Sequence, residues 1–144
     1  MKKYLHLLFL CLFFTSCAKG EVRVAKKVVV QEVSPFTTRI HFPFDSYVVP
    51  DSEFSALDQN VAWLKKKPEA VFILEGHCDE WGENIYNLQL GDLRAREVKA
   101  YLIEKGIDPE RVIMVVSFGG NRPLDERHLP DAWRQNRRVE FVLR

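Results

Sequence analysis

After residue 36, segments whose apolar residues recur with the period of a strand alternate with segments in which they recur with the period of a helix. Residues 39–44 alternate apolar and polar side chains, which is the pattern of a half-buried strand. Residues 71–75 form a short, nearly continuous apolar run that suits a buried central strand, and residues 112–118 predict a third strand. Residues 139–143 alternate again, so we expect a closing strand with one buried face.

Two helices are predicted between these strands. Residues 51–67 and 85–105 each place apolar side chains on one helical face, and Gly106 is positioned to end the second helix. Residues 76–83 and 119–130 are expected to be loops. The order β-α-β-α-β-β, with only a short turn before the last strand, predicts an α+β two-layer sandwich. In it the helices pack on one face of a four-stranded sheet.

The first 16 residues have the layout of a secretory signal peptide. Lys2 and Lys3 precede an apolar run over residues 4–14. About eleven apolar residues cover only ~16 Å as a helix, well short of the ~30 Å hydrocarbon core of a bilayer. Export followed by cleavage is therefore a better interpretation than a permanent membrane span.

Cys17 ends a segment, Phe-Thr-Ser-Cys, that resembles the bacterial lipobox, although leucine is more usual than phenylalanine at its first position. Cysteines of this kind are acylated, and two or more acyl chains give stable anchoring. Residues 17–36 are then expected to be a lipidated tether, within which the Val-rich residues 28–30 would also suit an added edge strand. A plain signal peptide with an incidental cysteine is the alternative.

Composition and charge favour one ordinary globular domain over residues 37–144. The chain is 47% hydrophobic and 28% charged, which is enough for a packed core. Its formal net charge of +1 argues against a protein that neutralises many nucleic-acid phosphates. The sequence has no Cys-x-x-Cys, no His-Glu-x-x-His and no phosphate-binding glycine loop, so no metal, cofactor or catalytic residue is expected.

Residues 77–80 read His-Cys-Asp-Glu, but they do not predict a metal site. Adjacent residues on an extended chain point in opposite directions and make poor common ligands. His77 is expected to be a hydrogen-bonded structural residue. Cys78 is the one thiol left after cleavage and lipidation, and we expect it to be buried as a small hydrophobe, with an interchain disulfide as the alternative.

Asp79 and Arg94 are the charged residues whose positions suggest a binding site. Asp79 lies in the loop after the second predicted strand, and Arg94 lies on the helix that follows. The end of a strand is where ligands commonly bind in α/β sheets. If the two are held apart, the carboxylate of Asp79 can accept from the ammonium of an amino-acid zwitterion, and the guanidinium of Arg94 can donate a bidentate pair to its carboxylate. From the pattern alone, a direct salt bridge between the two residues or a solvated Arg94 remains an alternative.

Several segments together resemble the OmpA-like C-terminal domain family, and within it the peptidoglycan-associated lipoproteins. They are Glu-Gly-His-Cys-Asp-Glu-Trp-Gly at 75–82, Tyr-Asn-Leu-Gln-Leu-Gly at 86–91, Arg-Ala at 94–95, Phe-Pro-Phe-Asp at 42–45, Val-Ser-Phe-Gly at 116–119 and Asn-Arg-Arg-Val at 136–139. The likeness covers roughly residues 40–144. It implies a mixed sheet and non-covalent binding of meso-diaminopimelate in the stem peptides of the cell wall.

The resemblance also implies roles for individual residues. Asp79 and Arg94 match the positions that hold the amino and carboxylate groups of diaminopimelate. Asp45 and Leu90 match positions that line the same groove, and Phe44, Trp81 and Asn136 are also expected to take part in binding. Asn136 and its neighbour Arg137 are expected to steady the groove or to contact the ligand. Trp81 stands where arginine is frequent, and Cys78 where alanine or threonine is usual, so these two departures leave the fine specificity open.

Location and partners follow from the resemblance as further expectations. It implies an outer-membrane lipoprotein of the Tol-Pal system, anchored through Cys17, with a TolB-like periplasmic partner and roles in envelope integrity and cell division. A stator subunit of the MotB type would need a transmembrane helix with a functional aspartate, which the N-terminal run lacks. The remaining alternative is an interaction lipoprotein that binds protein partners with weak or no wall binding, and Trp81 keeps it open.

Overall fold

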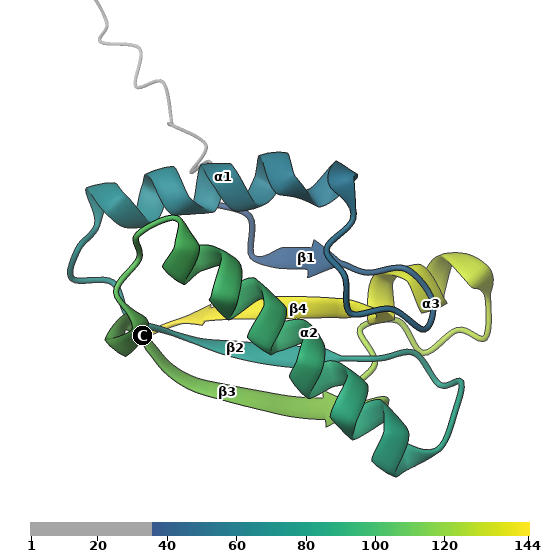
Figure 1. The fold of residues 1–144 in the computed structure, drawn as a ribbon. Coiled ribbons are helices and arrows are strands. Elements are labelled where there is room, and N and C mark those ends of the chain that lie inside the picture. Colours follow the sequence, from purple (N-terminus) through teal and green to yellow (C-terminus); the bar gives the residue numbers. More distant parts are fainter. Residues whose placement is uncertain (1–35) are drawn as a thin grey trace, which may run out of the picture. The chain divides into compact units, whose positions relative to one another are not determined.

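Residues 36–144 are described by a computed structural model, in which helices pack on one face of an open sheet (Figure 1). The elements in chain order are β1 (Arg39–His41), α1 (Asp51–Lys66), β2 (Phe72–His77), α2 (Asn84–Glu104), the 3-10 helix η1 (Pro109–Arg111), β3 (Val112–Gly119), α3 (Pro130–Asn136) and β4 (Arg138–Leu143). The predicted α+β class is confirmed. The predicted signal peptide and most of the predicted tether lie outside the described residues.

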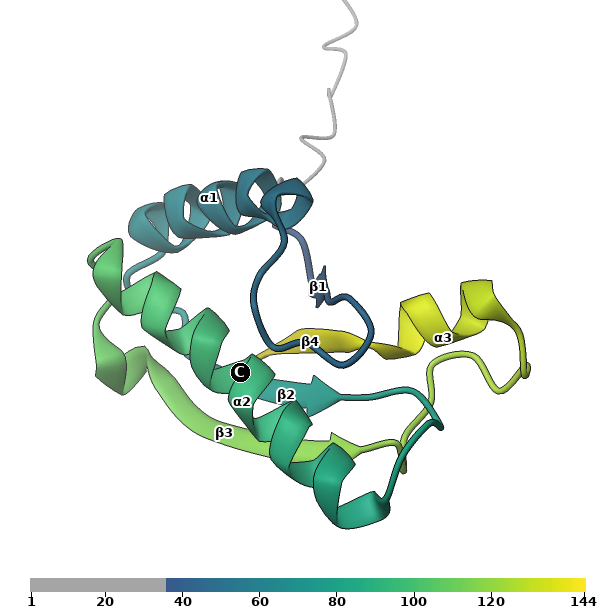
Figure 2. The ribbon, with the colours of Figure 1, turned by 45° about the vertical axis from the view of Figure 1, so that its right-hand side comes forward.

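The four strands form a mixed sheet in the order β1-β4-β2-β3. Strands β2 and β3 are parallel, whereas β4 runs antiparallel to both of its neighbours, β1 and β2. The C-terminal ends of β1, β2 and β3 therefore lie at the same edge of the sheet as the start of β4. Segments far apart in the sequence meet at that edge, which Figure 2 shows on the side where α3 lies.

The hydrophobic core lies between the sheet and the two long helices. Helix α1 contributes Leu57 and Leu64, and α2 contributes Val98 and Leu102, all of them fully buried. They pack on the inward side chains of the sheet, which are Ile40, Phe72, Leu74, Val139 and Phe141. The predicted helical faces thus turn inward as expected. Helix α2 ends before Gly106, whose positive φ of 86° closes the helix in the way that glycine favours.

Two glycines allow α2 to lie very close to β2. A side-chain carbon added to Gly76 would collide with the backbone carbonyl of Gly91, and one added to Gly91 would collide with the Ser117 hydroxyl. Backbone contact of this kind leaves no room for a larger residue. The first turns of α2 are therefore held against the C-terminal end of β2.

The segment between β3 and β4 differs most from the sequence-based expectation. Residues 130–136 form the helix α3, where we predicted only the end of a loop and a short turn. Pro130 opens this helix, since a proline at the first position loses no hydrogen bond. Strand β1 ends at His41 instead of Phe44, and β2 runs on to His77 instead of ending at residue 75.

Phe36, at the end of the predicted tether, already belongs to the packed domain. Its ring lies 4.7 Å from Trp63 and 5.5 Å from Phe141, measured between ring centroids. Within residues 36–144, no helix is both long enough and apolar enough to cross a membrane.

Candidate ligand-binding cleft

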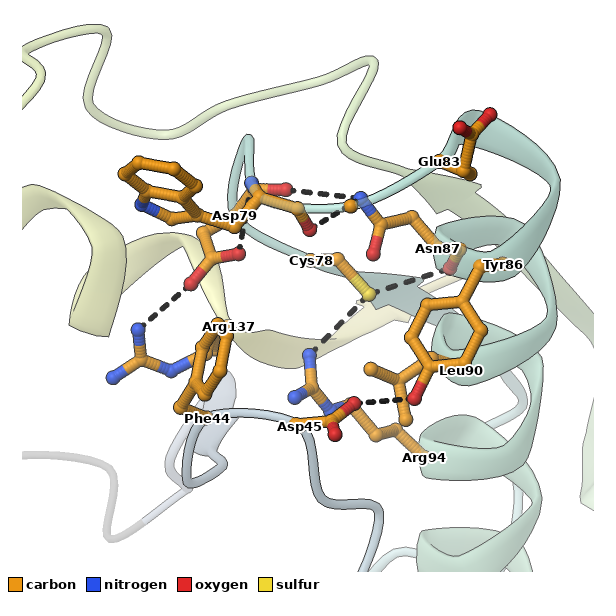
Figure 3. Close-up of a pocket in the computed structure, with 12 residues that line it drawn as sticks. Phe44, Asp45, Cys78, Asp79, Glu83, Tyr86, Asn87, Leu90, Arg94 and Arg137 are labelled. Carbon is orange, nitrogen blue, oxygen red and sulfur yellow. Dashed lines mark hydrogen bonds and ion pairs between the residues drawn. The ribbon is translucent and has the colours of Figure 1, made fainter.

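A cleft of about 450 Å³ opens at the sheet edge where the strand ends meet (Figure 3). Its walls come from the loop after β1, the loop after β2, the first turns of α2 and the residue before β4. The lining residues are Phe44, Asp45, Cys78, Asp79, Trp81, Gly82, Glu83, Tyr86, Asn87, Leu90, Arg94 and Arg137. The structure therefore brings together six of the seven binding residues predicted from the sequence, and Asn136 is the exception.

Asp79 pairs with Arg137 and not with Arg94. Its carboxylate is only 4% exposed, and Oδ2 lies 2.8 Å from Nη1 of Arg137. Oδ1 accepts the backbone N–H of Trp81 at 3.2 Å. The Nε–H of Arg137 donates to the carbonyl of Phe42 at 3.1 Å, whereas its Nη2 has no hydrogen-bond partner among residues 36–144. The direct salt bridge that the sequence left open is thus absent from the described structure.

Arg94 is fully buried beneath the cleft and binds backbone carbonyls. Its Nε donates to Ser46 at 2.8 Å, Nη1 donates to His77 at 2.9 Å, and Nη2 donates to Pro43 at 3.0 Å. Burial lowers the pKa of this guanidinium. Since Nη1 also approaches the Cys78 sulfur at 3.4 Å, one N–H, on Nη2, is left for a ligand. Arg94 is therefore not arranged for the bidentate contact that we expected.

Cys78 lies between Asp79 and Arg94 and is a buried free thiol, as predicted. Its sulfur donates to the carbonyl of Asn87 at 3.3 Å. Burial raises the pKa of the thiol to about 11, and the neighbouring Arg94 opposes that shift only in part. The group is therefore protonated at neutral pH and is not a nucleophile.

A second carboxylate lies on the opposite wall of the cleft. Asp45 accepts a short hydrogen bond from the Tyr86 hydroxyl, and this bond raises the pKa of Tyr86. Asp45 adopts a positive φ of 51°, in the turn that follows β1. Leu90 forms an apolar part of the cleft and is 7% exposed. Tyr86 was not among the predicted binding residues, although it lies in a segment that carries the resemblance. Arg137, which was expected to steady the groove or to contact the ligand, lines the cleft.

Two large apolar side chains flank the entrance. Phe44 is 63% exposed and Trp81 is 54% exposed. The Trp81 ring meets that of Trp133, on α3, edge to face at 5.4 Å. Trp133 therefore packs against a cleft residue and lies outside the core cluster.

The sequence pattern of the OmpA family matches residues 41–137, and this segment includes every residue that lines the cleft. The chain belongs to the OmpA family. The peptidoglycan-associated lipoprotein of Pseudomonas aeruginosa is 40% identical over 104 residues, or 72% of this chain and 61% of that protein. The one from Brucella melitensis is 34% identical over 105 residues, or 73% of this chain and 62% of that protein. The chain thus spans about three fifths of the length of these relatives, which are named as lipoproteins and not as enzymes.

Two solved structures have a similar fold. The crystal structure of the peptidoglycan-associated lipoprotein from Burkholderia pseudomallei has a TM-score of 0.70 at 35% identity, and the match covers 75% of this chain and 91% of that one. The C-terminal domain of Helicobacter pylori MotB has a TM-score of 0.68 at 18% identity, covering 75% and 84% respectively. The second likeness shows a shared fold alone.

Asn136 lies outside the cleft of this OmpA-family domain. Its Oδ1 accepts the backbone N–H groups of Leu124 at 2.7 Å and Asp125 at 2.9 Å, and its Nδ2 donates to the Asp125 carbonyl at 2.8 Å. The amide is buried, and all of these contacts hold the loop before α3. Between residues 36 and 144, no group of three or more His, Cys, Asp and Glu side chains is arranged to hold a metal ion.

His77 is not the hydrogen-bonded residue that we predicted. It is 2% exposed, its ring stacks on Phe118 at 5.5 Å, and neither ring nitrogen has a hydrogen-bond partner among the described residues. Burial, together with the charge of Arg138, lowers the pKa of this imidazole to about 4. Glu140 and the backbone of Arg122 oppose the shift without reversing it. His77 is therefore neutral in the folded protein at neutral pH.

The pH dependence of stability should reveal this buried histidine. Between the unfolded pKa of about 6.5 and the folded pKa of about 4, the unfolded chain binds a proton that the native chain does not. The neutral His77 lowers the free energy of unfolding by nothing above pH 6.5, but by about 3 kcal/mol once the pH has fallen to 4. We expect His77→Phe to remove this part of the slope in urea unfolding measured from pH 7 to pH 4. His41→Gln, at a half-exposed histidine, should keep it, and equal slopes for parent and His77→Phe would contradict the assignment.

Proposed function

We propose that this chain is an outer-membrane lipoprotein that binds peptidoglycan non-covalently through meso-diaminopimelate. One observation carries the proposal: Asp79 and Arg94 line the same cleft without bonding to one another. The names of the relatives support it, because they are peptidoglycan-associated lipoproteins. Binding without catalysis is part of the proposal.

The free end of a diaminopimelate side chain carries an ammonium and a carboxylate on one carbon. In the proposed complex, Asp79 accepts from the ammonium, since its carboxylate has acceptor positions beyond those used by Arg137 and Trp81. The ligand carboxylate lies towards the remaining N–H of Arg94, on Nη2. Asp45, Phe44 and Leu90 line the rest of the cleft.

Affinity for a single stem peptide should be modest. Each charge-assisted contact contributes about 1.5 to 3 kcal/mol, and immobilising the ligand opposes this gain. A wall presents many copies of the same group, and a tethered domain stays close to them, so rebinding increases retention.

The rest of the proposal concerns residues and partners beyond the described structure. We infer that residues 1–16 are a signal peptide, that Cys17 carries the lipid anchor, and that residues 17–36 link the anchor to the domain. In this arrangement the protein joins the outer membrane to the wall within the Tol-Pal system, with a TolB-like periplasmic protein as partner. A role in envelope integrity and cell division follows from that link.

Cell walls whose stem peptides differ at one chemical group test directly whether diaminopimelate is the ligand. Lysine in a stem peptide keeps the side-chain amine of diaminopimelate but lacks the carboxylate beside it. The full chain in mild detergent should sediment with sacculi that contain meso-diaminopimelate, and at least about tenfold less with sacculi that contain lysine, which is the loss of one charge-assisted contact. Equal sedimentation with both walls would overturn the diaminopimelate assignment, and sedimentation with neither would favour an interaction protein without wall binding.

A further inference from the structure

A second hollow adjoins the cleft on the side of α3. It has a volume of about 320 Å³ and is lined by Phe44, Asp79, Trp81, Pro130, Trp133, Arg134 and Arg137. Four of these residues, namely Phe44, Asp79, Trp81 and Arg137, also line the cleft. The two spaces therefore adjoin along these residues, and we call the second one the tryptophan hollow.

The aromatic walls of the tryptophan hollow are held in place. The rings of Trp81 and Trp133 meet at 81°, and the indole N–H of Trp133 donates to Oε1 of Glu80 at 2.7 Å. On the cleft side, the backbone of Trp81 is bound at both ends, by Asp79 at 3.2 Å and by the Asn87 amide at 3.0 Å. Walls fixed in this way lose little freedom when a ligand packs on them.

Two arginines and one aspartate line the tryptophan hollow, so its lining carries a net positive charge. The Nη1 of Arg137 is paired with the aspartate, Asp79, and its Nη2 has no acceptor among residues 36–144. Arg134, on α3, is two-thirds exposed, and its one ion pair within the described residues is with the exposed Asp131. A guanidinium with an open N–H beside apolar rings suits a carboxylate attached to a small aliphatic group.

We propose that the tryptophan hollow binds the free carboxylate of the amino acid next to diaminopimelate in the stem peptide. This inference rests on the proposed function, because diaminopimelate must occupy the cleft. Two neighbours supply the same chemistry: the α-carboxylate of the preceding D-glutamate and the C-terminal carboxylate of the following D-alanine. Arg134 and Arg137 contact the anion, and the indole rings pack on its aliphatic carbons. A neutral sugar of the glycan strand would bring no negative charge to the open N–H groups of the two arginines.

Short synthetic ligands separate the two sites in calorimetric titrations of the full chain in detergent. The reference ligand is meso-diaminopimelate blocked by acetyl and methylamide groups at its L-centre, which fills the cleft alone. The second ligand adds γ-linked D-glutamate before the reference, and the third adds C-terminal D-alanine after it. Each extended ligand is paired with a form in which the added carboxylate is an amide. A disaccharide attached in place of the carboxylate tests the neutral sugar.

One of the two extended ligands should bind the parent roughly tenfold more tightly than the reference, and its amide should lose that gain. The ligand that shows the gain identifies the neighbour. Arg134→Gln should reduce the gain at least threefold and leave the affinity for the reference ligand within a factor of two, because Arg134 does not line the cleft. Arg96→Gln, at an exposed arginine of α2, is the matched control and should behave as the parent.

The possible failures are distinguishable. If the parent binds the reference ligand but neither carboxylate adds affinity, or if the gain survives amidation or Arg134→Gln, the tryptophan hollow is not a carboxylate site and the proposed function stands. A gain in affinity from the disaccharide alone would likewise show that the tryptophan hollow is not a carboxylate site, and the proposed function would stand. If the parent binds none of the ligands, the proposed function and this inference are overturned together.

Discussion

Replacing Arg94 by methionine is expected to lower the free energy of unfolding by at least about 3 kcal/mol. The methionine keeps much of the buried volume but leaves the carbonyls of Pro43, Ser46 and His77 without their donors, and each unsatisfied buried group costs about 1 to 3 kcal/mol. Arg94→Lys should restore little, because one ammonium cannot span three carbonyls on two segments.

Urea unfolding followed by circular dichroism measures this loss. Arg96→Met is the matched control on the same helix, since Arg96 is two-thirds exposed and contacts only Asp92. We expect it to change stability by less than about 0.5 kcal/mol. An Arg94→Met protein within 1 kcal/mol of the parent would show that the buried contacts of Arg94 contribute little. Because Arg94 supports the fold, loss of wall binding in its variants does not by itself identify a ligand contact.

Asp79→Asn is the cleaner change for wall binding, and we expect it to weaken binding by about 10-fold to 100-fold. The substitution preserves shape and removes the negative charge proposed to hold the ligand ammonium. The asparagine oxygen can still accept from Arg137, whose second contact to the Phe42 carbonyl is unaffected. The variant should therefore stay folded.

Sedimentation with sacculi containing meso-diaminopimelate measures the effect of Asp79→Asn. Asp92→Asn makes the same change in net charge on the far side of α2 and should sediment as the parent does. An unfolding curve for each variant verifies that it is folded. Parent-like sedimentation of a folded Asp79→Asn protein would rule out Asp79 as the main contact.

Periodicity predicted the parts of the fold that depend on a long repeated pattern. The inward faces of α1 and α2 followed from apolar residues at helical spacing over four or more turns, as with Leu57 and Leu64. Helix α3 has only seven residues, too few to show a period, and Trp133 within it points towards a loop instead of the core. We predicted Pro130 to end a loop, although proline is also favoured at the first position of a helix.

The charged pairing in the cleft could not be predicted from spacing. Asp79 and Arg137 are 58 positions apart and meet because β4 inserts between β1 and β2. Asp79 and Arg94, the two residues selected from the sequence, line one cleft. The contacts of Arg94 with backbone carbonyls have no sequence signature, because any residue provides a carbonyl.

The short path between Phe36 and the cleft determines how a mechanical load would cross the domain. If the chain is held by lipid at one end and by the wall at the other, as proposed, a pull enters near Phe36 and leaves through the ligand contacts of Asp79 and Arg94. Between these points lie β1, which pairs with β4 among the described strands, and two arginines that join the segment after β1 to the cleft. Arg137 binds both the Phe42 carbonyl and the Asp79 carboxylate, and Arg94 binds two carbonyls of that segment. Since Phe42 is also a core residue, the rupture strength of the link should depend on these two arginines together with the packing of the core.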